Sequence, residues 1–179
     1  MEDTEKVVTT DLTGQIALFS PRLRAFALSL GNDDREAEDL AQETCLRAIG
    51  ARDRFVPGTN LKAWLFTILH NLHRNRRRDA GVRPALVGLD DLDEGWADAT
   101  SARHAEVERV ALARAEVTEV MTAFRTLPPA FAIPLHLVAV EDLSYAQVAQ
   151  ILEVPVGTVM SRIYRARRLL IARLADPRA

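Results

Sequence analysis

Apolar residues recur at the three- and four-residue spacing of an α-helix between residues 12 and 30. This stripe comprises Leu12, Ile16, Phe19, Leu23, Phe26, Ala27 and Leu30. Pro21 lies inside the run and is expected to kink it or divide it into two helices, because proline cannot donate the backbone hydrogen bond of a helix interior. Gly31-Asn32 then ends the run, as glycine and asparagine commonly end helices.

Two further amphipathic helices are predicted in the N-terminal half. The segment 33–55 begins with acidic residues, which favour a helix N-terminus. Its expected inward residues are Ala37, Leu40, Ala41, Thr44, Cys45 and Ala48. Its outer, mostly acidic face holds Glu38, Asp39, Gln42, Glu43 and Arg47. Asn60 is expected to cap a helix over 61–79, whose predicted buried stripe is Leu61, Trp64, Leu65, Ile68 and Leu72.

The C-terminal half predicts a long helix from about Glu106 to Phe124, which ends before Leu127-Pro128-Pro129. Pro134 is expected to kink or divide the helix that follows. His136 is expected to be a packed core or boundary residue. Ser144 and Gln147 have the spacing of a capping box at the start of another helix, with Tyr145, Val148, Ala149 and Leu152 as its buried stripe.

The segment after this helix predicts a helix-turn-helix. Glu153-Val154-Pro155 breaks the first helix, and Gly157 is expected to let the backbone turn closely. In the second helix one face is apolar: Val159, Ile163, Ala166, Leu170 and Leu174. The other face carries Thr158, Ser161, Arg162 and Arg165, which suits a recognition helix in a DNA major groove. A solvated surface helix is the plainer alternative for the same pattern.

Length and charge fit a small all-α protein of two domains. The 179 residues divide into a helical domain over 8–79, a flexible acidic linker over 80–105 and a helix-turn-helix domain over 106–175. The formal net charge is −2, but acids and arginines are segregated by segment, so local fields matter more than the total. We expect the low net charge to keep the free protein from binding any DNA that it meets.

Several functional classes find no support in the sequence. We see no glycine-rich phosphate loop, no nucleophile–base grouping and no Cys/His spacing for zinc, so we expect neither an enzyme nor a cofactor or metal site. His70 and His73 lack a third ligand, and Cys45 is expected to be a small buried residue. No apolar run is long enough to span a membrane, so a cytoplasmic protein without membrane insertion is expected.

Three motifs resemble the extracytoplasmic-function branch of the bacterial sigma-70 family, in the family's order along the chain. They are DLAQET at 39–44, AWLFTILHN at 63–71 with its arginine-rich tail, and GTVMSRIYRARR at 157–168. The family usually has Glu at the position of Gln147, where an amide can still form the cap. It more usually has Arg and Gly at the positions of Ala132 and Asp142.

The resemblance implies a role for each basic or acidic face. Thr158, Ser161, Arg162 and Arg165 would read the −35 promoter element. Asn71, Arg74, Asn75 and Arg78 would recognise and help to melt the −10 element, together with the loop from Asp53 to Asn60. Glu38, Asp39, Gln42 and Glu43 would dock on the clamp helices of the polymerase β′ subunit. From the residues alone, an ordinary solvated helix face remains the alternative for this acidic surface.

The resemblance also implies partners and a mode of action. An alternative sigma factor binds core RNA polymerase, through the β′ clamp helices and the β flap, and directs promoter recognition, DNA melting and transcription initiation. Members of the family are usually held inactive by a separate anti-sigma factor. The competing hypothesis is a stand-alone helix-turn-helix regulator with an N-terminal sensing or dimerisation domain, which would leave DLAQET and AWLFTILHN without a purpose.

Overall fold

The computed structural model describes residues 12–81 and 117–175, and within these ranges the secondary structure is helical, without strands. Residues 12–18 are helical and are followed by α2 (Ser20–Ser29), α3 (Asp34–Gly50), the 3-10 turn η1 (Arg52–Arg54) and α4 (Leu61–Asp79). The second part holds α6 (Val117–Arg125), α7 (Pro129–Ala139), α8 (Tyr145–Leu152) and α9 (Val156–Ala175). The all-α prediction is confirmed. All but the first two residues of the predicted linker lie outside the described residues.

Local sequence signals explain most helix boundaries in the first domain. Pro21 stands at the start of α2, so it divides the first apolar run as predicted. Asp33 forms a capping box with Glu36 at the start of α3, where the sequence analysis predicts only an acidic first turn. Asn60 caps α4 by accepting a hydrogen bond from the backbone N–H of Ala63 at 3.2 Å.

The buried face of α4 differs from the predicted stripe. Its buried residues are Leu65, Phe66, Leu69 and Leu72, whereas Leu61, Trp64 and Ile68 are only partly buried. Trp64 packs its ring against Phe55 with 5.3 Å between the ring centroids, at the edge of the domain. Apolar residues occupy most positions from 63 to 69, so the helical period alone could not fix which of them face the core.

Of the two outcomes expected at Pro134, a kink or a division, division does not occur, because α7 continues from Pro129 to Ala139 through the proline. The helix loses one backbone hydrogen bond at this proline, yet Ala132, Leu135 and Leu137 are buried around it. Packing on several sides therefore holds α7 as one helix. His136 is 6% exposed and is a core residue, as expected.

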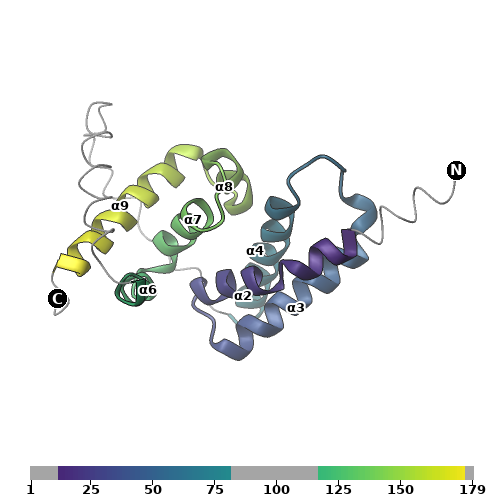
Figure 1. Ribbon diagram of the computed structural model, residues 1–179, viewed down its shortest axis with the longest axis horizontal. Coiled ribbons are helices and arrows are strands. Elements are labelled where there is room, and N and C mark those ends of the chain that lie inside the picture. Colours follow the sequence, from purple (N-terminus) through teal and green to yellow (C-terminus); the bar gives the residue numbers. More distant parts are fainter. Residues whose placement is uncertain (1–11, 82–116, 176–179) are drawn as a thin grey trace, which may run out of the picture.

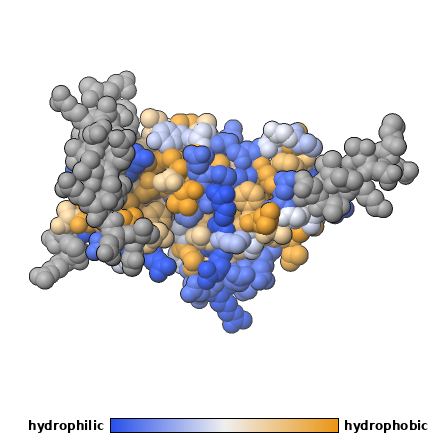
Figure 2. Space-filling model, viewed as in Figure 1, coloured by the Kyte–Doolittle hydropathy of each residue, from blue (hydrophilic) through white to orange (hydrophobic). Residues whose placement is uncertain are grey.

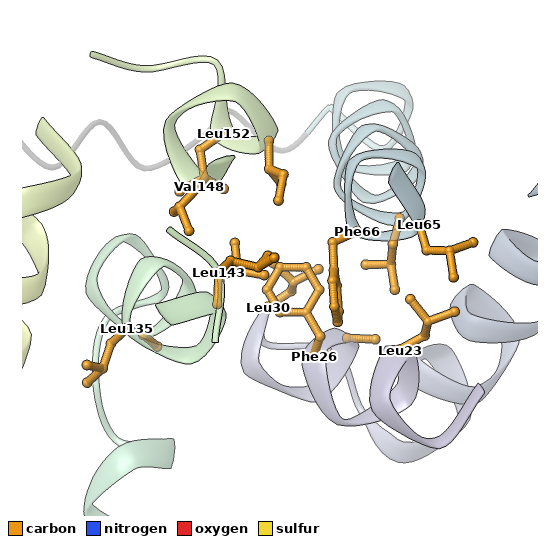
Figure 3. Close-up of a cluster of buried hydrophobic side chains, with 14 of the residues drawn as sticks. Leu23, Phe26, Leu30, Leu65, Phe66, Leu135, Leu143, Val148 and Leu152 are labelled. Atoms are coloured by element: carbon orange, nitrogen blue, oxygen red, sulfur yellow. The ribbon is translucent and has the colours of Figure 1, made fainter. Parts of the chain in front are cut away.

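The two domains pack against each other, with α8 beside α4 and α7 beside α2 (Figure 1). Figure 3 shows the cluster where they meet: Phe26 and Phe66 lie near Leu30 and Leu143. The rings of Phe26 and His136 join the two domains with 5.4 Å between their centroids. The hydrophobic core is therefore continuous across the domain boundary.

A buried carboxylate also lies at this boundary, and no pattern in the sequence predicts it. Glu141 has a side chain only 1% exposed, and its Oε2 is 2.8 Å from Nη2 of Arg22 in α2. Its backbone carbonyl accepts a hydrogen bond from Nζ of Lys62 in α4. Burial tends to raise the pKa of Glu141, but His136 and Arg22 outweigh it, and the pKa lies below its ordinary value. Glu141 is therefore a charged group held between the domains.

Candidate functional site

The predicted recognition residues lie on one face of α9. Thr158, Ser161, Arg162 and Arg165 are each partly exposed, whereas Val159, Ile163, Ala166 and Leu170 on the opposite face are buried. Ser161 donates its hydroxyl to the backbone carbonyl of Thr158 at 3.1 Å. Burial lowers the pKa of Arg162, although an arginine stays cationic at neutral pH. The face thus offers hydroxyl and guanidinium donors together, as base edges and phosphates require.

The turn before α9 depends on a different residue from the one predicted. Glu153 ends α8 in the left-handed region, at φ 55° and ψ 44°. Gly157 has no positive φ and lies inside α9, so the prediction that it makes the close turn is wrong. The backbone N–H of Glu153 bonds the carbonyl of Gln150 at 3.4 Å, and that of Val154 bonds the carbonyl of Ala149 at 3.1 Å. These bonds satisfy carbonyl groups at the end of α8.

One exposed apolar side chain at the start of α9 was not singled out from the sequence. Val156 is 42% exposed at the N-terminal end of the helix, where recognition helices contact bases. Apolar side chains there can contact the methyl group of thymine. The signal available in the sequence was its position just after Pro155 and ahead of the buried stripe.

A second basic face lies on α4. Asn71, Arg74, Asn75 and Arg78 are spaced so that they share one side of the helix, and all except the partly buried Asn71 are exposed. Asn71 Oδ1 is buried and has no hydrogen-bond partner among the described residues. Arg74 is engaged by Glu153, its Nη2 lying 3.3 Å from Oε1 and its Nη1 bonding Oε2. One member of the predicted −10 face is therefore already occupied.

A cavity of about 330 Å³ separates the N-terminal end of α4 from α8. Hydroxyl, amide and aromatic groups dominate its walls, which comprise Thr59, Asn60, Ala63, Trp64, Thr67, Gln147, Gln150 and Ile151. The loop predicted to assist −10 recognition thus ends at the rim of this cavity, which Thr59 and Asn60 line. Figure 2 shows hydrophilic residues running through the centre of the view, where the domains adjoin.

The predicted docking residues share the outer side of α3 but differ in their pairing. Glu43 bonds Arg47 and Arg76, and these cations hold the pKa of its carboxyl below the ordinary value. Glu38 accepts a hydrogen bond from Gln42 at 2.9 Å. Asp39 and Gln42 are exposed. Leu46 continues this surface one turn further and is 70% exposed, which the sequence analysis does not predict.

The described parts of the chain offer neither a metal site nor a membrane-spanning helix. No group of three or more His, Cys, Asp or Glu side chains there could hold a metal ion. Within the same ranges, no helix is long and apolar enough to cross a membrane. Cys45 is partly buried, and burial raises the pKa of its thiol.

Comparison with known families assigns both domains. Residues 16–83 match the model for sigma-70 region 2, and residues 118–170 match the model for sigma-70 region 4. The chain is 41% identical over 172 residues to the ECF RNA polymerase sigma factor EcfG of Rhodopseudomonas palustris, which covers 93% of this chain and 87% of the relative. It is 32% identical to the RNA polymerase sigma-H factor of Pseudomonas aeruginosa, over 78% of this chain and 73% of that protein.

Solved structures agree with this assignment. The sigma factor RpoE of Bartonella quintana, solved in complex with the anti-sigma factor NepR, is 32% identical, with a TM-score of 0.63 over 94% of this chain and 99% of that one. CnrH, solved with the cytosolic domain of CnrY, is 26% identical, with a TM-score of 0.58 over 95% of this chain and 91% of that one. On these sequence and structural likenesses, the chain belongs to the extracytoplasmic-function sigma factors of the sigma-70 family.

Proposed function

We propose that this chain associates with core RNA polymerase and directs promoter recognition, DNA melting and transcription initiation. The observation that carries the proposal is that the two matched sigma-70 regions each present a basic, hydrogen-bonding helix face, on α4 and on α9. A stand-alone regulator would account for α9 only. The region 2 match and the sigma-factor relatives along most of the chain therefore favour initiation.

We assign the −35 element to Thr158, Ser161, Arg162 and Arg165, with Val156 as an added apolar contact at the start of α9. The −10 element is assigned to Asn71, Arg74, Asn75 and Arg78. Arg74 and Arg78 carry the charge that phosphates require, and the two asparagines carry amides that can pair with base edges. The domain limits 8–79 and 106–175 are retained as part of this proposal.

For polymerase docking, we assign the acidic side of α3 and add Leu46. Asp39, Gln42 and Leu46 lie one turn apart on the exposed side, so an apolar contact would adjoin a carboxylate and an amide. Such a mixed surface suits a helix with basic and amide side chains. The charge on Glu43 is already balanced by Arg47 and Arg76, so we expect Asp39 to contribute more to docking.

We also propose a cytoplasmic protein that is not itself an enzyme and that a separate anti-sigma factor holds inactive. The support is that the solved RpoE structure, which is a complex with the anti-sigma factor NepR, matches 94% of this chain.

The decisive experiment is co-elution of the purified chain with sigma-free bacterial core RNA polymerase, followed by promoter opening. We expect stable association, weakened about ten-fold by Asp39→Arg because the reversal puts two like charges together at the interface. Glu119→Arg makes the same charge change on an exposed part of α6 and should leave association unchanged. Failure of the wild-type chain to associate, with specific duplex binding by the free protein, would establish the regulator instead.

A further inference from the structure

Arg74 and Glu153 join the two proposed DNA-binding units directly. Arg74 belongs to the −10 face on α4, and Glu153 lies in the turn that leads into α9. The guanidinium bonds both carboxylate oxygens of Glu153. A carboxylate bound through both oxygens occupies the same planar pair of guanidinium N–H donors that would bind a phosphate. Arg74 therefore cannot contact a phosphate in this way while it is paired with Glu153.

We propose that the contact between Arg74 and Glu153, together with Glu141 at the domain boundary, is an intramolecular latch that closes the free chain and withholds the −10 face from DNA. The inference rests on the proposed function, because it takes Arg74 as a DNA contact. Glu153 then acts as an internal competitor for the nucleic-acid backbone. Domain separation, driven by binding to a partner, releases Arg74.

Glu141 provides the second element of the latch. Its carboxylate is buried against Arg22 of the other domain, and Lys62 binds its backbone carbonyl. Both partners come from the N-terminal domain, from α2 and α4. Breaking the boundary would remove these two cations from Glu141. The contacts of Glu141 with Arg22 and Lys62 are thus formed only in the closed arrangement, whereas His136 lies 3.8 Å from its carboxylate within the same domain. The two contacts across the boundary make the arrangement specific rather than a general apolar association.

The boundary is also built so that it can open. The Arg74–Glu153 pair is half exposed on both sides, with side-chain exposures of 48% and 54%. Exposed ion pairs stabilise weakly, so a competing phosphate can displace one. A cavity between the N-terminal end of α4 and α8 leaves these two helices incompletely packed along their contact. Residues 82–116 connect the domains and could extend over on the order of 100 Å, so the chain does not prevent separation.

The test uses Glu153→Gln and the double variant Glu141→Gln/Glu153→Gln in the full chain. Glutamine has the size of glutamate, so Glu153→Gln removes the charge and leaves the left-handed backbone at 153 no more strained than before. Spin labels at Arg35→Cys and Ala172→Cys, in a Cys45→Ala background, report the distance between domains. Anisotropy with a fluorescent random-sequence single-stranded 20-nucleotide DNA reports access to the basic face.

We expect a short, narrow label distance in the parent protein and a longer, broader one in the double variant. DNA affinity should rise roughly two- to five-fold for Glu153→Gln, the range that an exposed ion pair supports, and further for the double variant. Asp34→Asn and Asp34→Asn/Glu119→Gln remove the same charges outside the domain boundary. They control for net charge and should change neither the distance nor, beyond a small charge effect, the affinity.

The swap Arg74→Glu/Glu153→Arg tests the pair itself. The swapped pair should give the short label distance of the parent protein, and DNA affinity should stay low. A broad distance in the parent protein, or no change in distance and affinity in the double variant relative to its charge control, would overturn the latch. Polymerase-dependent promoter opening by the parent protein is measured in parallel. Its loss would refute the proposed function, whereas its persistence with an unresponsive double variant would refute only the latch.

Discussion

At the scale of single residues, His73 in α4 is held neutral by its surroundings. Its Nδ1 lies 3.4 Å from Nδ2 of Asn32 in the turn between α2 and α3. Asn32 also donates to the carbonyl of Ala27 at 2.7 Å, which leaves an amide hydrogen for the unprotonated ring nitrogen. Burial lowers the pKa of His73 from 6.5 to about 4, and the neighbouring Arg77, His70 and Arg76 act in the same direction.

This shift predicts a loss of stability in mild acid. Below pH 6.5 the unfolded chain binds a proton at His73 that the folded chain does not bind until about pH 4. Stability therefore falls as pH falls through that window. Between pH 7 and pH 5 the shift corresponds to at most about 2 kcal/mol, and partial exposure of the ring reduces this to about 1 kcal/mol.

Urea unfolding of wild type and His73→Gln at pH 7 and pH 5 measures this contribution. Glutamine stays neutral and can still accept the hydrogen bond of Asn32, so the variant should lose about 1 kcal/mol less than wild type on acidification. Equal losses in both proteins would exclude His73 as the source. The pKa of His70 is also lowered by burial, so part of the acid sensitivity should persist in the variant.

At the scale of the helices, α8 depends on its N-terminal cap because it has only eight residues. Ser144 accepts a hydrogen bond from the backbone N–H of Gln147 at 3.3 Å, and the Gln147 side chain accepts one from the backbone N–H of Ser144 at 2.9 Å. Ser144→Ala removes one half of this reciprocal pair. We expect it to lower the free energy of unfolding by about 1 kcal/mol.

Ser144→Thr is the matched control, since threonine is also a good cap and should cost only a few tenths of a kcal/mol. Thermal or urea unfolding compares the two variants with wild type. Amide hydrogen exchange locates the effect: exchange should accelerate in α8 for the alanine variant only. Indistinguishable stabilities of the alanine and threonine variants would show that packing of Val148 and Leu152, rather than the cap, sets the stability of α8.

The same helices show what a sequence can and cannot specify. Periodicity and caps predicted the division at Pro21, the caps at Asn60 and Ser144, and the apolar face of α9, because these depend on neighbours within a few residues. Continuity of α7 through Pro134 depends instead on tertiary packing. The left-handed turn at Glu153 is formed without glycine, and a glycine four residues further on misled the prediction. Asp142 also adopts the left-handed region without glycine, at φ 53°, at a position where glycine is more usual in the family.

The candidate site divides in a similar way. Its faces on α3, α4 and α9 were predicted by residue type and spacing, and the helices do place their members together. Exposure of Leu46 and Val156 depends on which neighbours cover them, and spacing does not report that. The ion pairs of Glu141 and Glu153 join residues 119 and 79 positions apart from their arginine partners, Arg22 and Arg74. Contacts at such separation leave no local pattern in the sequence.

At the scale of the whole molecule, charge is divided between the described domains and the rest of the chain. Arginines outnumber acids within residues 12–81 and 117–175, and the compensating acids lie in the remaining segments, including the cluster Asp90, Asp91, Asp93, Glu94 and Asp98. The net charge of −2 thus combines basic domains with acidic connecting sequence. Free protein should then bind DNA weakly, even though two of its helix faces are suited to it.

Neutralising the acidic cluster should strengthen binding of the free protein to random duplex DNA. The variant combines five substitutions: Asp90→Asn, Asp91→Asn, Asp93→Asn, Glu94→Gln and Asp98→Asn. We expect a gain of about three- to ten-fold at low salt that largely disappears near 0.2 M salt, because screening shortens the reach of charges to about 10 Å or less. Anisotropy titrations at several salt concentrations measure both affinity and its salt dependence.

Neutralising Glu2, Asp3, Glu5 and Asp11 instead should give a comparable gain in DNA affinity if total charge is the cause. A gain confined to the first variant would assign the effect to the position of the cluster, and tight, salt-sensitive binding by the wild type would refute the charge argument altogether.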